Sequence, residues 1–108
     1  MKKIVILLAA MLAGAPAHGA GNPDKGAAKA KAICAACHGE NGDRPASPDF
    51  PRLAGQRYDY LVKALSDYRS GARKNPVMGG QASNLSAEEV VDLSAFFASR
   101  KGALHVTH

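Results

Sequence analysis

The sequence predicts an all-α fold in which three main helices are joined by loops rich in glycine and proline. Apolar residues recur at intervals of three and four in two segments, which is the spacing of one helix face. Helix start and stop signals bracket three segments, at about 24–38, 56–70 and 86–101. No stretch alternates between apolar and polar residues as a half-buried strand does, so no sheet is expected.

The first helix is expected to begin at Asn22-Pro23-Asp24, with Asp24 as the N-cap, and to stop at Gly39. Alanine and lysine dominate this segment, and both have a high helix propensity. Its last turn is Cys34-Ala35-Ala36-Cys37-His38, which contains both cysteines of the chain. The predicted helix therefore carries two thiols and an imidazole at its carboxyl end.

The second helix is expected between two loops. Residues 40–54 and 72–82 are rich in glycine, proline and polar residues, so both segments are expected to be loops. Between them, a helix over about 56–70 has one apolar face and is closed by Gly71. That face consists of Tyr58, Leu61, Leu65 and Tyr68.

The third helix has the clearest start signal, because the residues from Ser86 to Glu89 match a capping box. Arg100 and Lys101 are expected in its last turn, where the helix dipole favours cations, and Gly102 is expected to end it. Its apolar face consists of Val90, Leu93, Phe96 and Phe97.

The start of the chain has the pattern of a secretory signal peptide. Two lysines precede an apolar stretch over residues 4–13, and cleavage is expected after Ala17 or Ala20. The apolar stretch is too short to span a bilayer comfortably, which argues against an uncleaved membrane anchor. Residues 1–20 are therefore expected to be removed on export, leaving residues 21–108 as one small domain.

The C-x-x-C-H motif at residues 34–38 is the attachment sequence of c-type haem. Two thiols one helical turn apart match the two vinyl groups of a porphyrin, and the next residue can bind the iron axially. The motif therefore predicts one covalently bound haem c, held by Cys34 and Cys37 and ligated by His38.

Other interpretations of the two cysteines stay open at this point. A thiol–disulfide redox pair expects a strand before the motif, whereas alanine-rich helical sequence precedes it. A structural zinc site needs four ligands, and the mature chain offers the two cysteines, His38, and two tail histidines at 105 and 108. A structural disulfide between the two cysteines would close a very small loop.

Met78 is the only methionine that remains after removal of the signal, and it is the expected second ligand of the iron. Pro76 before it and Gly79-Gly80 after it allow a turn close to the ring, and a haem with one histidine ligand often takes methionine opposite. The alternatives are His105, His108 or an open site. Six-coordinate iron has no vacant position for a substrate, so an electron carrier is expected rather than an enzyme.

The formal net charge is +5, to which the expected signal peptide contributes two lysines. No dense basic run with interleaved aromatic residues occurs, so nucleic-acid binding is not expected. The mild basic balance suits either an ordinary solvated surface or steering toward an acidic redox partner. Redox proteins are therefore the expected partners, without stable membrane insertion, and the chain is expected to be monomeric or weakly associating.

The chain resembles the small bacterial class I c-type cytochromes, the soluble monohaem group that includes the c-five and c-four-like domains. The resemblance covers essentially the whole mature chain, and it implies a class I cytochrome c fold in which helices and loops wrap around one haem. The first and last helices are then expected to cross near one haem edge. The matching segments are residues 34–39, 50–56, 60–61, 71–73, Met78 and the final helix at 93–97.

The resemblance also implies roles for further residues. Gly26 would allow the two helices to approach closely, with Phe96 or Phe97 packing opposite. The carbonyl of Pro51, with Pro48 as the alternative, is expected to accept the Nδ1–H of the ligating histidine. Candidates for contacts with the haem propionates are Gln56, Tyr60 and Arg73.

These features together predict a periplasmic monohaem cytochrome that carries single electrons between redox partners through a His/Met-ligated haem. The alternative is a haem-bearing electron-transfer subunit of a periplasmic dehydrogenase or oxidase complex. A third interpretation, an enzyme or gas sensor with an open haem site, requires that Met78 does not bind the iron.

Overall fold

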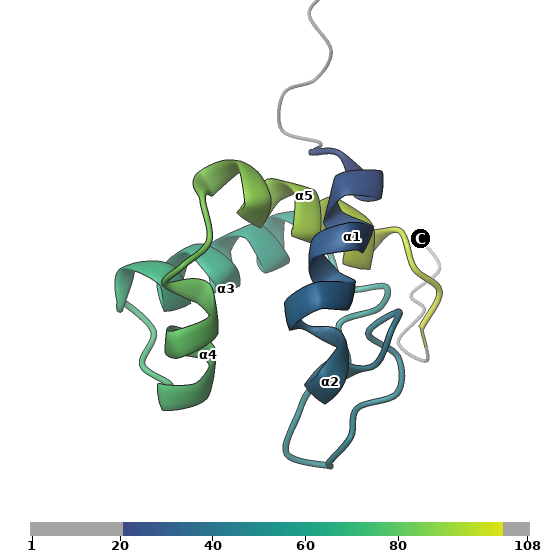
Figure 1. Cartoon of the computed structure of the whole chain (residues 1–108), viewed down its shortest axis with the longest axis horizontal. Helices are drawn as coiled ribbons and strands as arrows, with labels where there is room; N and C mark the ends of the chain where they lie inside the picture. Colours follow the sequence, from purple (N-terminus) through teal and green to yellow (C-terminus); the bar gives the residue numbers. More distant parts are fainter. Residues whose placement is uncertain (1–20, 103–108) are drawn as a thin grey trace, which may run out of the picture.

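The structure, a computed structural model, describes residues 21–102 and folds them into five α-helices (Figure 1). No strand occurs within this part of the chain, so the all-α prediction is confirmed. The expected signal peptide and the tail histidines lie outside the described residues. The helices are α1 (Pro23–Ile33), α2 (Ala35–His38), α3 (Tyr58–Ser70), α4 (Pro76–Ala82) and α5 (Ala87–Ala98).

Helix α1 starts earlier than predicted, because Asn22 rather than Asp24 is its N-cap. The Asn22 side chain accepts hydrogen bonds from the backbone N–H groups of Asp24 and Lys25, at 2.9 and 3.1 Å. Pro23 then takes the first helical position, where its missing N–H costs nothing. The predicted single helix is also broken at Cys34, whose φ of −105° separates α1 from the four-residue α2. The first cysteine of the motif therefore lies at the junction of two helices.

Helix α3 agrees with the prediction to within about two residues. It begins at Tyr58, and Gly71 closes it with a φ of 88°, the left-handed conformation that favours glycine. Its apolar face points to the core, where Leu61 is buried and Leu65 and Tyr68 pack against the buried cluster.

Met78 lies in a helix rather than in the loop that the sequence predicts for residues 72–82. Asn75 is the N-cap of α4, and its side chain accepts hydrogen bonds from the N–H groups of Val77 and Met78, both at 3.0 Å. Pro76 occupies the first helical position, as Pro23 does in α1. The Asn-Pro start signal outweighs the two glycines that suggested a loop.

Helix α5 begins as predicted. Ser86 Oγ accepts a hydrogen bond from the Glu89 N–H at 3.0 Å, and the Glu89 carboxylate accepts one from the Ser86 N–H at 2.9 Å. The capping box predicted from the sequence is therefore present in full.

The carboxyl end of α5 comes earlier than predicted, so Arg100 and Lys101 lie beyond its last turn. The Phe97 carbonyl accepts a hydrogen bond from the Gly55 N–H at 2.9 Å, a tertiary bond that ties the helix end to a distant loop. The Arg100 guanidinium lies 4.9 Å from the centroid of the Phe96 ring, where it covers apolar surface instead of capping the helix.

The core forms where α1 crosses α5 (Figure 1). A Cβ built on Gly26 would overlap the backbone carbonyl of Asp92 and lie 2.9 Å from the Cβ of Phe96. The close approach predicted at Gly26 is therefore confirmed, with Phe96 opposite. The buried apolar cluster comprises Ala30, Leu61, Ala82, Leu85, Val90, Leu93, Phe96 and Phe97.

Polar contacts join α1 and the segment before it to α5. The buried Asp92 carboxylate accepts a hydrogen bond from the Asn22 N–H at 2.7 Å, and Lys29 Nζ lies 3.0 Å from the Glu89 carboxylate. The backbone hydrogen bond at Ser86 and the one from Lys29 lower the pKa of Glu89. Within residues 21–102, no helix has the length and apolarity needed to cross a bilayer.

We expect Gly26→Ala to destabilise the holoprotein by about 1–3 kcal/mol, because the added methyl group must displace the α5 backbone. This effect opposes helix propensity, which favours alanine over glycine by about 1 kcal/mol. Ala28→Gly, at an exposed position of the same helix, calibrates propensity alone. Denaturant unfolding measures both variants, and a stabilising Gly26→Ala would contradict the close crossing.

We expect Glu89→Gln to lower the melting temperature at neutral pH and to have little effect in acid. The folded state lowers the pKa of Glu89. The carboxylate therefore stabilises the protein fully at pH values above the pKa it has in the unfolded chain. That stabilisation is lost as the pH falls through the depressed pKa, where wild type and variant converge. Glu88→Gln, one residue earlier, is the matched control, and a difference that persists in acid would disprove the electrostatic cause.

Candidate haem-binding site

The motif residues lie together where α1 ends and α2 begins. The Cys37 N–H and the His38 N–H both donate to the Cys34 carbonyl, at 3.2 and 3.0 Å, so the chain keeps a helical turn through the junction. This turn places the two half-buried thiols three residues apart on one face. Neither thiol is bonded to another cysteine. The geometry suits two attachments to one edge of a porphyrin.

The imidazole of His38 is buried, and its Nδ1 lies 2.8 Å from the carbonyl oxygen of Pro51. A carbonyl can only accept, so Nδ1 carries the proton and Nε2 keeps a free lone pair. The structure thus selects Pro51 over Pro48 as the acceptor. The Phe50 ring lies 6.1 Å from the imidazole, centroid to centroid, at an interplanar angle of 58°. His38 is prepared to bind a metal through Nε2 alone.

Two backbone hydrogen bonds, one on each side of Pro51 in the sequence, fix the loop between α2 and α3 that carries this residue. The Ala46 N–H donates to the Cys37 carbonyl at 2.9 Å, next to the motif. The Leu53 N–H donates to the Gly42 carbonyl at 2.8 Å, which folds the loop back on itself. Gly42 has a φ of 75°, and a Cβ built on it would lie 2.8 Å from the Phe97 ring. The loop is therefore packed against α5.

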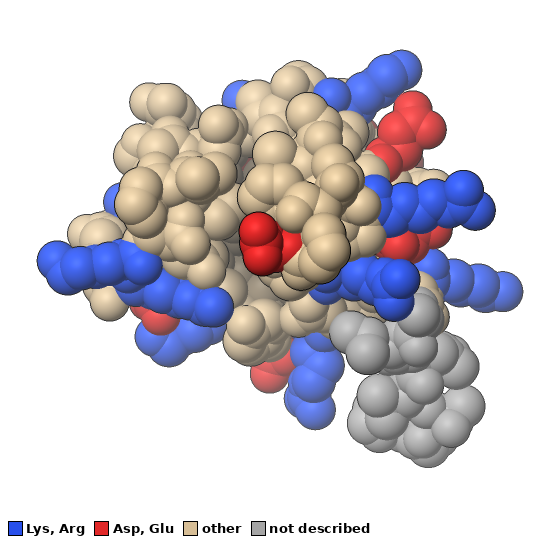
Figure 2. Space-filling view, turned by 90° about the horizontal axis from the view of Figure 1, so that it is seen from below, with Lys and Arg blue, Asp and Glu red and all other residues tan. Residues whose placement is uncertain are grey.

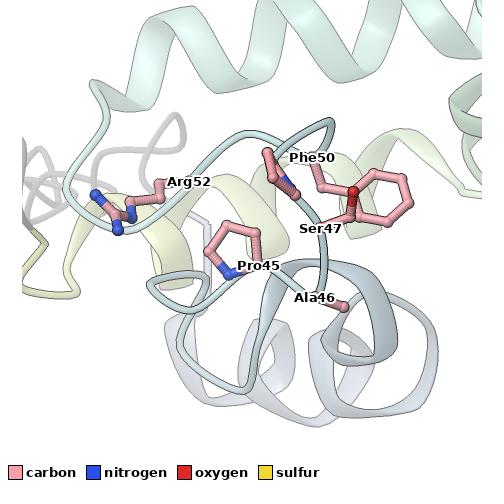
Figure 3. Close-up of a pocket in the computed structure, with 6 residues that line it drawn as sticks. Pro45, Ala46, Ser47, Phe50 and Arg52 are labelled. Carbon is pink, nitrogen blue, oxygen red and sulfur yellow. The ribbon is translucent and has the colours of Figure 1, made fainter.

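A pocket of about 490 Å³ opens in the same loop (Figure 3). Phe50, which contacts the His38 ring, is on its wall, but neither cysteine of the motif nor Met78 lines it. We infer that this pocket is a hollow within the loop and not the haem-binding site. Its lining residues are Pro45, Ala46, Ser47, Pro48, Phe50 and Arg52.

The acidity of Cys34 argues against a thiol–disulfide exchange site. Burial raises the pKa of the Cys34 thiol to about 11, although the charge of Lys29 opposes the shift. A dithiol oxidoreductase needs a thiolate at neutral pH on the first cysteine of its C-x-x-C motif, which requires a lowered pKa. Within residues 21–102, no three or more His, Cys, Asp and Glu side chains are grouped to hold a metal ion, so the described part provides no zinc site.

Met78 is partly buried in the first turn of α4. Figure 1 shows α2, which carries Cys37 and His38, and α4 at the same end of the molecule and on opposite sides of it. This arrangement is compatible with ligands approaching one ring from two sides. The iron–sulfur bond itself stays a prediction.

The three candidates for propionate contacts are in two places. Gln56 Nε2 donates to the Arg52 carbonyl within the loop, whereas Arg73 Nη1 donates to the Tyr60 hydroxyl at 3.3 Å beside α3. The hydrogen bond to Tyr60 raises the pKa of Arg73 further, so the guanidinium stays charged. The Arg73 Cζ also lies 4.7 Å from the centroid of the Tyr68 ring, a cation–π contact that the sequence does not predict. Contacts of these three residues with the propionates stay predictions.

The end of the molecule that carries α2 and α4 has a largely uncharged face (Figure 2). Lysine and arginine side chains extend from its periphery, and one acidic side chain lies near its middle. Val77, at the start of α4, is an apolar side chain that is 54% exposed. Such a face can dock another protein without a strong net charge.

Comparison with known proteins decides the family, since the cytochrome c family profile matches residues 23–101. The chain belongs to the cytochrome c family. It is a class I c-type cytochrome, and covalently bound haem c is its cofactor. The two thiols, and a buried imidazole with only Nε2 free, fit that group.

Among its relatives are cytochrome c4 proteins. That of Pseudomonas aeruginosa is 45% identical over 100 residues, which cover 93% of this chain and 49% of the relative. The crystal structure of reduced cytochrome c4 from Pseudomonas stutzeri superposes with a TM-score of 0.71 at 39% identity, over 78% of this chain and 48% of that one. This cytochrome thus spans about half the length of the cytochrome c4 relatives.

A shorter relative is matched over most of its own length. Cytochrome c-554(548) of Halomonas halodenitrificans is 38% identical over 71 residues, which cover 63% of this chain and 84% of the relative. A protein of Stutzerimonas stutzeri named thiosulfate dehydrogenase electron acceptor is 47% identical over 70 residues, covering 65% of this chain and 32% of the relative. The match to cytochrome c-554(548) thus extends over most of a relative that is shorter than the cytochrome c4 proteins.

We expect Gly42→Ala to destabilise the holoprotein more than Gly71→Ala does. Both glycines have a positive φ, so both substitutions cost about 1–2 kcal/mol in backbone strain. Only Gly42 faces a close neighbour, the Phe97 ring, and overpacking there adds about 1–3 kcal/mol. Thermal unfolding followed by haem absorbance measures both; equal effects would mean that the loop does not pack against α5 as described.

Proposed function

We propose that this cytochrome shuttles single electrons in the periplasm, through a haem tethered by Cys34 and Cys37 and ligated by His38 and Met78. The observation that carries the proposal is the buried imidazole whose Nδ1 is held by the Pro51 carbonyl, 2.8 Å away. That bond leaves one nitrogen for iron and makes it a better donor.

The bound haem supplies the one-electron couple of its iron. The chain would supply two ligands of different character: His38, oriented by the Pro51 carbonyl, and Met78, a soft neutral sulfur that favours the ferrous state. Two ligands that would stay bound in either oxidation state would keep rearrangement during the transfer small. With Met78 as a ligand, the iron would have no position left for small molecules, which supports electron transport rather than catalysis.

The proposed partners are redox proteins that meet the uncharged face of Figure 2. Cations at its edge would orient an acidic partner during approach, and a small interface would release it quickly. Export follows from the signal peptide proposed for residues 1–20, with cleavage after Ala17 or Ala20. The free protein is then a monomer, or associates weakly, without nucleic acid and without stable membrane insertion.

A second candidate is a haem-bearing electron-transfer subunit of a larger periplasmic oxidoreductase complex. It is favoured by the name of the Stutzerimonas stutzeri relative, thiosulfate dehydrogenase electron acceptor. Size-exclusion chromatography of an untreated periplasmic extract separates the candidates, because a free carrier elutes near its monomer mass and a subunit elutes with its complex.

Attachment and processing are tested together on the protein recovered from the periplasm. We expect a c-type pyridine haemochrome spectrum, and an intact mass equal to the chain without its first 17 or 20 residues plus one haem. A colourless protein whose two thiols both react with an alkylating agent would contradict the proposal.

We expect Met78→Ala to abolish the weak far-red ferric absorption band that marks an iron–methionine bond. The variant should bind CO rapidly when reduced, and its reduction potential should fall by on the order of 100 mV, because axial ligands set haem potentials over about 0.8 V. Val77→Ala, at the exposed neighbouring position, is the control and should keep band and potential. A wild-type protein without the band, or a Met78→Ala variant with unchanged potential and no CO binding, would assign the sixth position to another residue.

A further inference from the structure

The two ends of α4 are anchored to different degrees. At its carboxyl end Ala82 is fully buried and Leu85, just beyond, is 5% exposed, so this end belongs to the core. At its amino end every residue from 71 to 77 is exposed. The Asn75 cap organises the first turn internally but does not attach it to the rest of the protein. Burial therefore fixes one end of the helix, and Met78 lies near the other.

Arg73 connects this exposed segment to α3. Its backbone N–H donates to the Asp67 carbonyl at 3.0 Å, which continues the turn that Gly71 begins. Its side chain reaches back along α3, where Nη1 donates to the Tyr60 hydroxyl at 3.3 Å and the guanidinium lies 4.7 Å from the centre of the Tyr68 ring. The side chain thus spans two aromatic residues that lie eight positions apart on one helix.

The two aromatic contacts are unequal in how firmly they hold. Tyr68 packs against the buried cluster, so it is a fixed platform, whereas Tyr60 is 48% exposed and offers a polar tip. The guanidinium carries several donors on one extended planar group, so Cζ lies over the Tyr68 ring while Nη1 donates to Tyr60. Lysine has a single compact ammonium for both contacts. The two contacts therefore depend on the shape of the arginine side chain as well as on its charge.

We propose that Arg73 is a positioning residue for the sixth ligand: it holds the amino end of α4 against α3 and so keeps the Met78 sulfur on the iron. The inference rests on the His38/Met78 ligation proposed above. Each contact is weak because it is exposed, but opening of a short segment is a local equilibrium that small contributions shift measurably. Loss of Arg73 then raises the fraction of molecules in which the sulfur has left the iron.

Binding of free imidazole to the ferric holoprotein measures this fraction, because imidazole takes the sixth position only when Met78 leaves. We expect Arg73→Ala to raise the apparent affinity for imidazole by about threefold or more. The loss of one exposed cation–π contact and one hydrogen bond raises the population of the open state by about this factor. Arg73→Lys should behave similarly, because it keeps the charge without the planar group. Tyr60→Phe, which removes one acceptor, should give a smaller rise.

Arg69→Ala is the matched control. Arg69 is exposed on α3 and makes no side-chain hydrogen bond or ion pair with any residue in 21–102, so this variant loses the same charge without the contacts. Its imidazole affinity should equal that of wild type. The global unfolding midpoints of Arg73→Ala and Arg69→Ala should agree, since the core is untouched in both.

Three results would overturn the inference. The first is equal imidazole affinity in Arg73→Ala and Arg69→Ala. The second is a fall in the global unfolding midpoint of Arg73→Ala large enough to account for the change. The third is a shift of reduction potential without a change in imidazole affinity, rescued by Arg73→Lys, which would assign Arg73 to a propionate. Should Arg73→Ala not accumulate as holoprotein, Arg73→Lys and Tyr60→Phe decide by the same criteria.

Failure of the proposed His38/Met78 ligation gives a different result from failure of the role proposed for Arg73. A wild-type ferric protein without the far-red band, which binds imidazole as readily as the Met78→Ala variant, would remove both proposals. A wild-type protein with the band, and variants that respond alike, would remove only the role of Arg73.

Discussion

The hydrogen bond from His38 Nδ1 to the Pro51 carbonyl is the contact on which the haem site depends, and it exists only because distant parts of the chain are fixed. The loop that carries Pro51 folds back through the Gly42 carbonyl, and Gly42 lies against the Phe97 ring. Phe97 in turn belongs to α5, whose position is set by its close crossing with α1 at Gly26. A change at that crossing therefore reaches the iron ligand through packed backbone, without touching the haem.

The two proposed iron ligands are held very differently by the surrounding chain. On the histidine side the imidazole is buried and its supporting loop is bonded to both the motif and α5. On the methionine side, residues 71–77 are exposed and only the carboxyl end of α4 enters the core. Local opening follows the number of buried contacts, so the methionine side has the lower cost of opening. The sulfur ligand is then the one whose retention depends on surface contacts.

The sequence predicts the three long helices and the attachment residues because their signals are local: caps, helical periodicity and the C-x-x-C-H motif. The role of Pro51 came from the resemblance to class I cytochromes, since no local pattern marks a carbonyl acceptor. Helix α4 was missed although its signal was present, because the two glycines were weighed above the Asn75-Pro76 start. The early end of α5 coincides with a tertiary bond from the Gly55 N–H to the Phe97 carbonyl, which no local sequence pattern marks.

The distribution of charge bears on how a mildly basic carrier finds partners. The three ion pairs described for residues 21–102, Lys29–Glu89, Arg57–Asp59 and Lys63–Asp67, neutralise three of the acidic groups locally. Paired charges contribute little field beyond their own surroundings, whereas unpaired cations act over about one Debye length, roughly 8–10 Å in physiological salt. Since the edge of the uncharged face in Figure 2 carries lysine and arginine side chains, steering there depends on local charges. Net charge is therefore a poor guide to how strongly this cytochrome orients an acidic partner.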